Sequence, residues 1–312
     1  MVPLRGVIPA HLLPFTADLE IDEPNLRRHL RGLLDVDGVA GITTNAHASE
    51  VATLTVDEQR RQLDIVLDEV AGQVPVISGV YQDGSAKAAR IAADAEAAGA
   101  DALLVFPSVV FDGGSQLRPE MAFAHYSEIA AATSLPMIAF VYSSASGLRL
   151  GTDAIVRICS EIDNVVAIKE WSNDIVAYER NLRAVRELDK PVSVLSSFSR
   201  SLLASLVLGA DGVLSGHGSI VVDLHVELWR AVEKQDLAEA RRIWDRIRPL
   251  AEVCYADPFL DGHNRMKVAL AELGRIDEAH VRPPLLPVTD AERSRIADAV
   301  RAAGLPRGSA SE

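Results

Sequence analysis

Cysteine is scarce in this sequence. The 312 residues include two, Cys159 and Cys254, and no C-x-x-C pair. Two distant cysteines build neither the disulfide framework of a small secreted domain nor a thiolate zinc site. We expect both to be reduced and buried.

No H-x-x-x-H spacing occurs among the histidines, so we predict no metal site.

Positive charge is also in short supply. The net charge is -13 and the isoelectric point is near 5.1. Nucleic acids and anionic membranes bind basic surfaces, because affinity comes largely from counterion release and attraction to phosphate. We therefore expect no nucleic acid and no membrane as partners. Aromatic residues make up only 5% of the chain, yet 48% of residues are hydrophobic, which is enough for a large core.

No apolar run approaches the roughly 20 residues that span a bilayer. The N-terminal stretch is interrupted by Pro3, Pro9 and Pro14 and lacks the basic start and continuous apolar centre of a signal peptide. We interpret it as the first strand of a cytoplasmic protein. A Walker loop and a G-x-G-x-x-G turn are missing as well, which leaves no visible seat for a nucleotide cofactor.

What the chain does have is a regular alternation of strand-like and helix-like segments. Short aliphatic runs occur at residues 7–8, 39–43, 76–78, 102–106, 137–140, 165–168, 192–195 and 212–214. Amphipathic stretches lie between them, for example at 57–70, 85–98, 119–132, 153–161 and 175–188. Continuous apolar strands alternating with helices indicate a parallel sheet covered by helices. About eight repeats predict an α/β fold of the (β/α)₈ TIM-barrel type.

The alternation stops after the eighth strand. Helical patterns continue at 223–234, 237–253, 264–273 and 290–303. We predict barrel strands and seven helices in 1–222, barrel helix eight with a C-terminal helical extension in 223–304, and a disordered tail at 305–312. The basic segment 263–267 is interpreted as a solvated helix start or a subunit contact. Helix starts are predicted at Thr55, with Glu58 completing a capping box, and at Thr152.

Catalytic groups of such barrels lie where strands end and the following loops begin. Lys169 closes the apolar run V-V-A-I-K. Desolvation at that place lowers the pKa of a lysine and supplies a free amine that attacks a carbonyl, as Schiff-base catalysis requires. An ion pair with Glu170 or another acid at the barrel rim is the structural alternative.

The loop after the second strand, residues 41–50, is dense in small and polar residues. Successive backbone N–H groups of such a turn can hold a carboxylate, and the hydroxyls of Thr43, Thr44 and Ser49 can add donors. An ordinary polar loop is the alternative.

Several segments together resemble one family. They are G-V-x-G-I-x-x-N followed by Glu50, L-T-x-D-E, V-P-V-I-x-G-V, A-G-A-D-A-L-L-V-F-P, L-P-M-I, V-A-I-K-E and G-A-D-G-V-L-S. This order is similar to the dihydrodipicolinate synthase and N-acetylneuraminate lyase family of Schiff-base aldolases, over nearly the whole chain. The resemblance implies a barrel with a helical extension, Lys169 as the imine-forming lysine, a 2-oxo acid such as pyruvate as substrate, and no cofactor besides the imine. It also implies a homo-oligomer, either a dimer or a tetramer.

The sequence departs from the family pattern at the proton relay. The loop threonines of the family fall on His47 and Ala48, and the tyrosine of its fifth strand falls on Phe140. Tyr142 lies two residues further along and so on the same face of a strand. Tyr142 and His47 are therefore the candidate acid–base groups, with a rim aromatic and an ordinary loop histidine as the alternatives.

The second departure concerns the substrate. The arginine that the family's synthases use for a second carboxylate falls near Ala145, and Arg149 is the nearest substitute. We therefore do not expect a true dihydrodipicolinate synthase. The glycine-serine loop Ser215-Gly216-His217 is of a kind that holds phosphate in some barrels, although no lysine or arginine accompanies it.

These observations predict an enzyme, a lyase of the class I aldolase type. Lys169 would attack a 2-oxo acid, and backbone N–H groups at Ala48 and Ser49 would hold its carboxylate. The expected substrate-binding residues are Thr44, Ala48, Ser49, Phe140, Ser215, Gly216 and His217. A dehydratase or hydratase-aldolase using the same imine, and a degenerate barrel that binds a 2-oxo acid without turnover, remain the alternatives.

Overall fold

The computed structural model describes residues 4–307, within which eight strands form one parallel sheet. They are β1 (Gly6–Pro9), β2 (Ile42–Thr44), β3 (Val76–Val80), β4 (Ala102–Val105), β5 (Met137–Val141), β6 (Val165–Glu170), β7 (Ser193–Ser196) and β8 (Gly212–Ser215). Their order is β1-β8-β7-β6-β5-β4-β3-β2. Parallel bridges Val7–Val39 and Ala10–Thr43 connect the segments at the two ends of this order. The predicted (β/α)₈ barrel is thereby confirmed.

A helix follows each strand, and three more close the chain. The helices are α1 (Glu23–Leu34), α2 (Val56–Val70), α3 (Ser85–Ala98), α4 (Glu120–Ala130), α5 (Thr152–Glu161), α6 (Ile175–Arg186), α7 (Leu202–Val207), α8 (Gly218–Glu233), α9 (Leu237–Cys254), α10 (Gly262–Glu272) and α11 (Asp290–Ala303). Short 3₁₀ turns are η1 (His47–Ser49), η2 (Val51–Thr53), η3 (Val109–Gly113), η4 (Ser115–Leu117), η5 (Ser199–Ser201) and η6 (Phe259–Asp261). The predicted strands and helices are all present, with ends shifted by a few residues.

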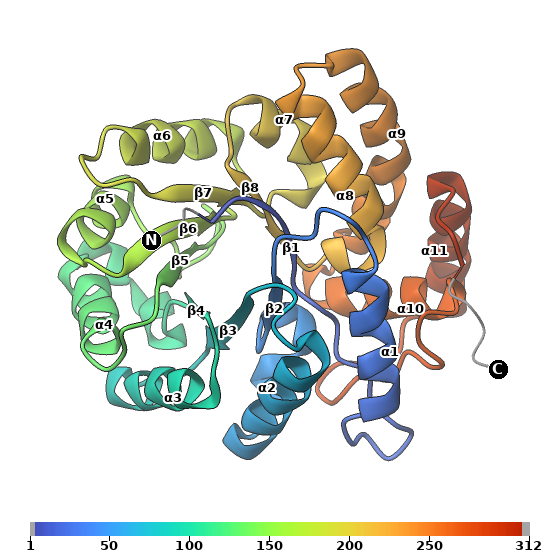
Figure 1. Ribbon diagram of the computed structural model, residues 1–312, viewed down its shortest axis with the longest axis horizontal. Helices are drawn as coiled ribbons and strands as arrows, with labels where there is room; N and C mark the ends of the chain where they lie inside the picture. The colour runs from blue at the N-terminus through green and yellow to red at the C-terminus, as the bar shows by residue number, and fades with distance from the viewer. Residues whose placement is uncertain (1–3, 308–312) are drawn as a thin grey trace. The chain divides into compact units, whose positions relative to one another are not determined.

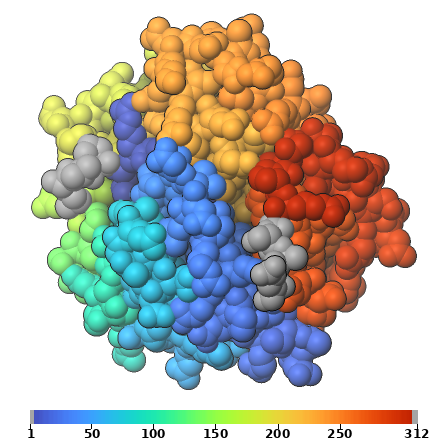
Figure 2. Space-filling view, turned by 45° about the vertical axis from the view of Figure 1, so that its right-hand side comes forward, coloured from blue at the N-terminus to red at the C-terminus, as the bar shows by residue number. Residues whose placement is uncertain are grey.

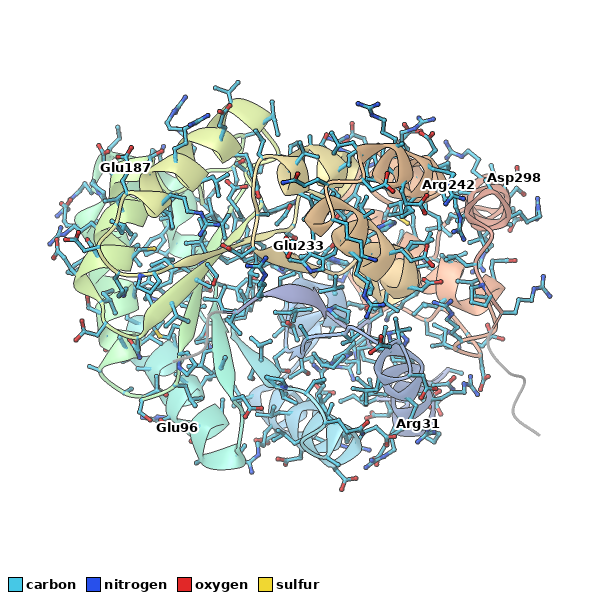
Figure 3. The ribbon with its side chains drawn as sticks, turned by 45° about the horizontal axis from the view of Figure 1, so that its top comes forward. Arg31, Glu96, Glu187, Glu233, Arg242 and Asp298 are labelled. Atoms are coloured by element: carbon cyan, nitrogen blue, oxygen red, sulfur yellow. The ribbon has the colours of Figure 1, made fainter. Side chains whose placement is uncertain are left out.

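By its internal contacts the chain divides into two compact units. Unit 1 comprises Met1–Gly6 and Pro75–Leu214, and unit 2 comprises Val7–Val74 and Ser215–Glu312. In unit 1, strands β3 to β6 are buried almost throughout, and helices α3 to α6 lie on their outer side (Figure 1). Charged side chains such as Glu96 and Glu187 extend from the outer side of these helices, away from the strands (Figure 3).

Unit 2 combines the beginning and the end of the chain. Figure 2 shows the blue surface of its N-terminal part beside the orange and red surface of its C-terminal part. Asn25 and Arg28 of α1 hydrogen-bond Asp277, which follows α10. The predicted division between residues 222 and 223 falls inside α8, next to the non-helical Val221. As a domain boundary it stays a prediction, and residues 308–312 of the predicted tail lie outside the described residues.

The caps of the helices follow the local sequence closely. Thr55 and Glu58 form the predicted capping box at the start of α2. Gly99 ends α3 at a φ of 103°, a backbone conformation that glycine adopts without steric cost. The predicted cap at Thr152 is wrong by one residue: Gly151 caps α5, and the Thr152 hydroxyl instead donates to Asn181.

Two parts of unit 2 differ from the sequence interpretation or extend it. Helix α1, capped by Asp22 and burying Leu26, Leu30 and Leu33, was not among the predicted segments. The segment 263–267 is not a solvated helix start, since Arg265 and Lys267 are 1% and 0% exposed.

Both cysteines are free and buried as predicted. No helix among the described residues is long and apolar enough to span a membrane.

Candidate active site

Lys169 is the next-to-last residue of β6, and the register of the sheet pairs it with Phe140 of β5 and Leu195 of β7. Its side chain is buried, with 5% of the residue exposed. Among residues 4–307 no carboxylate forms an ion pair with its ammonium group, which lies 4.1 Å from the centroid of the Phe140 ring. Desolvation lowers the pKa of Lys169 to about 7. A substantial fraction of this lysine is therefore a free amine at neutral pH.

Glu170 points to the opposite face of β6 and is not the partner of Lys169. One carboxylate oxygen accepts a hydrogen bond from the Asn181 amide of α6 at 3.0 Å. The other accepts from the backbone N–H and the hydroxyl of Ser172, each at 3.2 Å. Burial raises the pKa of Glu170 to about 6. The ion-pair alternative for Lys169 is thus wrong, because side chains of adjacent strand residues alternate between faces.

Five aromatic side chains of unit 1, out of the fifteen in the chain, form one group of ring contacts that includes Phe140, the ring against Lys169. Phe140 and Tyr142 have ring centroids 4.6 Å apart, as expected for alternate residues at the end of β5 and directly after it. Trp171 lies 6.0 Å from Phe140 and 5.7 Å from Tyr142, and Phe106 and Tyr81 extend the group. Sequence reasoning missed Trp171, although its position two residues after Lys169 was a usable signal.

Burial among these rings affects the acidity of Tyr142. Tyr142 is 7% exposed, and burial raises the pKa of its phenol well above the usual value. A tyrosine is protonated at neutral pH even without this shift, so the phenol can act as a proton donor, and burial opposes its ionisation.

The loop after β2 belongs to unit 2 and is organised by a residue that sequence reasoning missed. The Gln62 amide of α2 donates to the Thr44 hydroxyl at 2.7 Å and to the Ser49 hydroxyl at 3.1 Å. His11 lies 2.9 Å from the same Thr44 oxygen through its Nε2. The Thr44 side chain, predicted to bind substrate, is thus already engaged within the protein. Gln62 lies thirteen residues beyond Ser49 on a helix face, a spacing that gave no sequence signal.

The turn η1 uses one of the two predicted carboxylate donors itself. The N–H of Ser49 donates to the Ala46 carbonyl at 3.1 Å, and the N–H of Glu50 to the His47 carbonyl at 3.0 Å. The expectation that the Ser49 N–H holds a carboxylate is therefore corrected, because a 3₁₀ turn consumes that donor. The N–H of Ala48 comes before the first N–H that the turn uses. The predicted role of Ala48 in holding the substrate carboxylate therefore stays a prediction. His47 begins the turn and is half-buried.

The end of β8 brings Gly216 against this turn. A Cβ atom on Gly216 would lie 3.0 Å from the Ala48 Cβ, so a side chain there would force the turn to shift. The Ser215 hydroxyl accepts the His217 N–H at 3.1 Å. His217 is fully buried, neither ring nitrogen has a hydrogen-bond partner among the described residues, and burial lowers its pKa to about 3. A neutral, buried imidazole adds no positive charge for a phosphate.

Arg149, considered as a substitute for the missing arginine, lines a different cavity. This cavity of about 350 Å³ in unit 1 is also lined by Arg180 and Gln116, and Lys169 and Tyr142 are not among its lining residues. Within residues 4–307 no cluster of three or more His, Cys, Asp or Glu side chains is arranged to hold a metal ion.

The chain is similar in sequence to proteins of one family. Residues 3–303 match the profile of the dihydrodipicolinate synthetase family. The chain is 32% identical over 285 residues to the 4-hydroxy-tetrahydrodipicolinate synthase of Methanopyrus kandleri, with 90% of each chain covered. It is 31% identical to the enzyme of that name from Neisseria meningitidis serogroup B, with 96% of this chain and 99% of the other covered.

Solved structures show the same fold. A putative dihydrodipicolinate synthetase from Pseudomonas aeruginosa has 27% sequence identity and a TM-score of 0.87, with coverage of 96% of this chain and 99% of that one. The prophage protein YagE of E. coli K12, crystallised with pyruvate, has 22% identity, a TM-score of 0.88 and the same coverage. The chain belongs to the dihydrodipicolinate synthetase family.

Proposed function

We propose that this protein is a Schiff-base lyase of the aldolase type that acts on a small 2-oxo acid such as pyruvate. The observation that carries the proposal is Lys169, a buried lysine that forms no ion pair with a carboxylate of residues 4–307 and whose pKa is lowered to about 7. Enzymes of this family use a lysine Schiff base with pyruvate and no separate cofactor. The pyruvate bound to YagE supports the substrate class.

The chemistry begins with the neutral amine of Lys169, which attacks the C2 carbonyl of the 2-oxo acid and forms a carbinolamine. Loss of water gives an imine, and the protonated imine withdraws electrons from C3. For cleavage, the C4 hydroxyl gives up its proton and becomes an aldehyde carbonyl as the bond between C3 and C4 breaks; the electron pair of that bond enters the imine system as an enamine, which then takes a proton at C3. For condensation, the pyruvate imine loses a proton from C3 to give the same enamine, which attacks an aldehyde, and the new alkoxide takes a proton.

The proposal gives that proton transfer to Tyr142, or in its place to His47. Tyr142 qualifies because its phenol keeps its proton at neutral pH and packs against Phe140, whose ring contacts the Lys169 ammonium group. The predicted roles of Ala48, Ser215 and Gly216 in substrate binding belong to the proposal as well. So do a cytoplasmic location and a homo-oligomeric state.

The proposal excludes the full dihydrodipicolinate synthase reaction. Its support is Ala145, a residue without charge at the place of the family's carboxylate-binding arginine, together with the location of Arg149 in a separate cavity. The relatives that bear the synthase name are about 30% identical to this chain, an identity at which related barrels host different substrates.

A substrate panel tests the function. The purified protein is incubated with pyruvate and a series of aldehydes, with 4-hydroxy-2-oxo acids, and with sugar acids that can lose water, and products are followed by mass spectrometry. Aldol formation or cleavage supports the proposal. Water loss alone would replace it by a dehydratase or hydratase-aldolase, and an adduct on Lys169 without any turnover would indicate a binding protein.

A further inference from the structure

The C-terminal extension buries a lysine that the mechanism does not use. Lys267 of α10 has a side chain that is 0% exposed, and it forms an ion pair with Glu50, whose side chain is 2% exposed. The Lys267 ammonium also donates to the His280 carbonyl at 2.8 Å and lies 4.2 Å from the centroid of the Phe15 ring. A buried ion pair is weak evidence for stability, because desolvation of both charges offsets their attraction. Its directional contacts point instead to a role in fixing one specific conformation.

Glu50, the partner of Lys267, lies in the turn at residues 46–50, and the proposed function gives this turn a part in binding the substrate. Glu50 directly follows η1 and precedes η2, and its backbone adopts φ 53° and ψ 37°. This left-handed conformation is unfavourable for a residue with a side chain and persists only where surrounding contacts hold it. The Glu50 carbonyl accepts the Thr53 N–H at 2.8 Å, which fixes the far side of the turn.

A second cation from the extension holds the same segment. The backbone N–H of Arg282 donates to the Glu50 carboxylate at 3.3 Å. Its guanidinium donates to the Thr53 carbonyl at 3.2 Å and to the Glu58 carboxylate at 2.6 Å. The Arg282 guanidinium lies 4.5 Å from the centroid of the Phe15 ring that Lys267 also contacts. Residues 50–58 are therefore tied to a part of the chain more than 200 residues away.

We propose that Lys267 is a positioning residue: through Glu50 it holds the turn at residues 46–50 in the conformation that binds the carboxylate of the 2-oxo acid. This inference rests on the proposed function for the identity of the ligand. The positioning itself rests on the contacts within unit 2. The extension thereby has a role in binding, and Lys267 acts without touching the substrate.

The helix α10 provides a matched control. Arg265 is equally buried, at 1% exposure, and pairs with Glu292 of α11 at 3.0 Å. Its guanidinium also lies 4.0 Å from the Asp261 carboxylate and donates to backbone carbonyls, including that of Pro258, and none of the ion pairs and hydrogen bonds described for it involves Glu50. Arg265→Met removes a buried cation from the same helix and leaves the turn at 46–50 untouched.

The test compares the full-length protein with Lys267→Met, Glu50→Gln and Arg265→Met. The first measurement is hydrogen exchange at the amides of Ser49 and Glu50, which the turn protects. We expect at least tenfold faster exchange in Lys267→Met and Glu50→Gln and less than a twofold change in Arg265→Met. Melting temperatures of all variants are measured alongside, to separate general destabilisation from a local change in the turn.

The second measurement is the pyruvate concentration that gives half-maximal borohydride trapping on Lys169. We expect it to rise at least tenfold in Lys267→Met and Glu50→Gln, with the amount trapped at saturation unchanged. Equal exchange rates and equal half-saturation in Lys267→Met, Glu50→Gln and wild type would overturn the proposal, as would equal effects in Arg265→Met. If wild type traps no 2-oxo acid, the proposed function fails, and the exchange rates alone then decide the positioning role. If Lys267→Met does not fold, the isosteric Glu50→Gln carries both measurements.

Discussion

Lys169 combines burial with the lack of an ion-pair partner in the part of the chain that the structure describes, and the two properties have one physical consequence. An ammonium group removed from water and not compensated by a carboxylate loses its preference for the charged form. The Phe140 ring at 4.1 Å is the only charge-stabilising contact described for it, and it compensates desolvation only in part. The result is a nucleophile, at the expense of folding stability.

Replacement of this lysine separates chemistry from structure. We expect Lys169→Arg to abolish imine formation and turnover while the protein stays folded, because a guanidinium group does not form an imine and remains protonated. Circular dichroism and turnover assays check both parts. Activity near that of the wild type would contradict the assignment of Lys169.

The lowered pKa predicts a pH profile. The neutral amine is the reactive form, so the rate of imine formation at low pyruvate should rise about tenfold per pH unit below pH 6 and level off above pH 8. The turning point follows from the Lys169 pKa of about 7. Initial rates of trapping with cyanoborohydride measure it. A rate that continues to rise toward pH 10 would indicate an ordinary, solvated lysine.

Tyr142 is the second residue whose burial predicts function. Its phenol stays protonated, so removal should impair proton transfer and leave imine formation intact. We expect Tyr142→Phe to lower turnover by 10² to 10⁴-fold, about 3 to 5 kcal/mol of barrier, while trapping on Lys169 persists.

The control for this prediction is His47→Ala, which tests the competing candidate. Near-normal turnover in Tyr142→Phe together with its loss in His47→Ala would transfer the proton relay to the turn after β2.

At the scale of elements, strands and helices were predictable because each carries a local pattern. The strand that ends in Lys169 is a continuous apolar run, and the capping box of α2 is visible in Thr55 and Glu58. Contacts between distant segments carry no such pattern. Lys267 was predicted to be solvated because its neighbours are polar, but Glu50, 217 residues earlier, neutralises it in the core. The Ser49 N–H was misassigned because its use depends on the turn type.

The attachment of α6 to β6 gives a prediction at this scale. The Asn181 amide donates to Glu170, and its oxygen accepts from the Thr152 hydroxyl at 2.8 Å. Asn181→Leu keeps the volume but leaves the buried Glu170 oxygen without its donor. We expect a loss of about 1–3 kcal/mol in the free energy of unfolding, measured by urea denaturation at pH 8, where Glu170 is ionised.

A result within 0.3 kcal/mol of the wild type would show that Asn181 does not help to hold α6 on the strand that carries Lys169. Asn164→Leu is a suitable control, because this amide lies in the same unit and donates only to the backbone carbonyls of Thr133 and Leu135.

At the scale of the whole molecule, family membership fixes the type of chemistry, and departures from the family pattern set its limits. The match covers residues 3–303. The departures at His47, Ala48, Phe140 and Ala145 lie in loops or toward the end of a strand, where a barrel fold changes its substrate without changing its core.

These departures predict poor condensation of pyruvate with aspartate semialdehyde. Ala145 offers no charge to the second carboxylate of that product, which is the basis of the proposed exclusion. We expect a condensation rate at least a hundredfold below that of a family member that has the carboxylate-binding arginine. The rate is measured in an assay coupled to a reductase that consumes the condensation product. A robust rate would show that this chain is a synthase with a different carboxylate contact.

The proposed function depends most on the imine at Lys169. The direct measurement is reduction with borohydride in the presence of pyruvate at neutral pH, followed by digestion and mass spectrometry of the peptide that contains Lys169. We predict one adduct per chain, with the mass of a reduced pyruvate imine, located on Lys169 and missing from Lys169→Arg. No adduct, or an adduct on another lysine only, would contradict the proposed function.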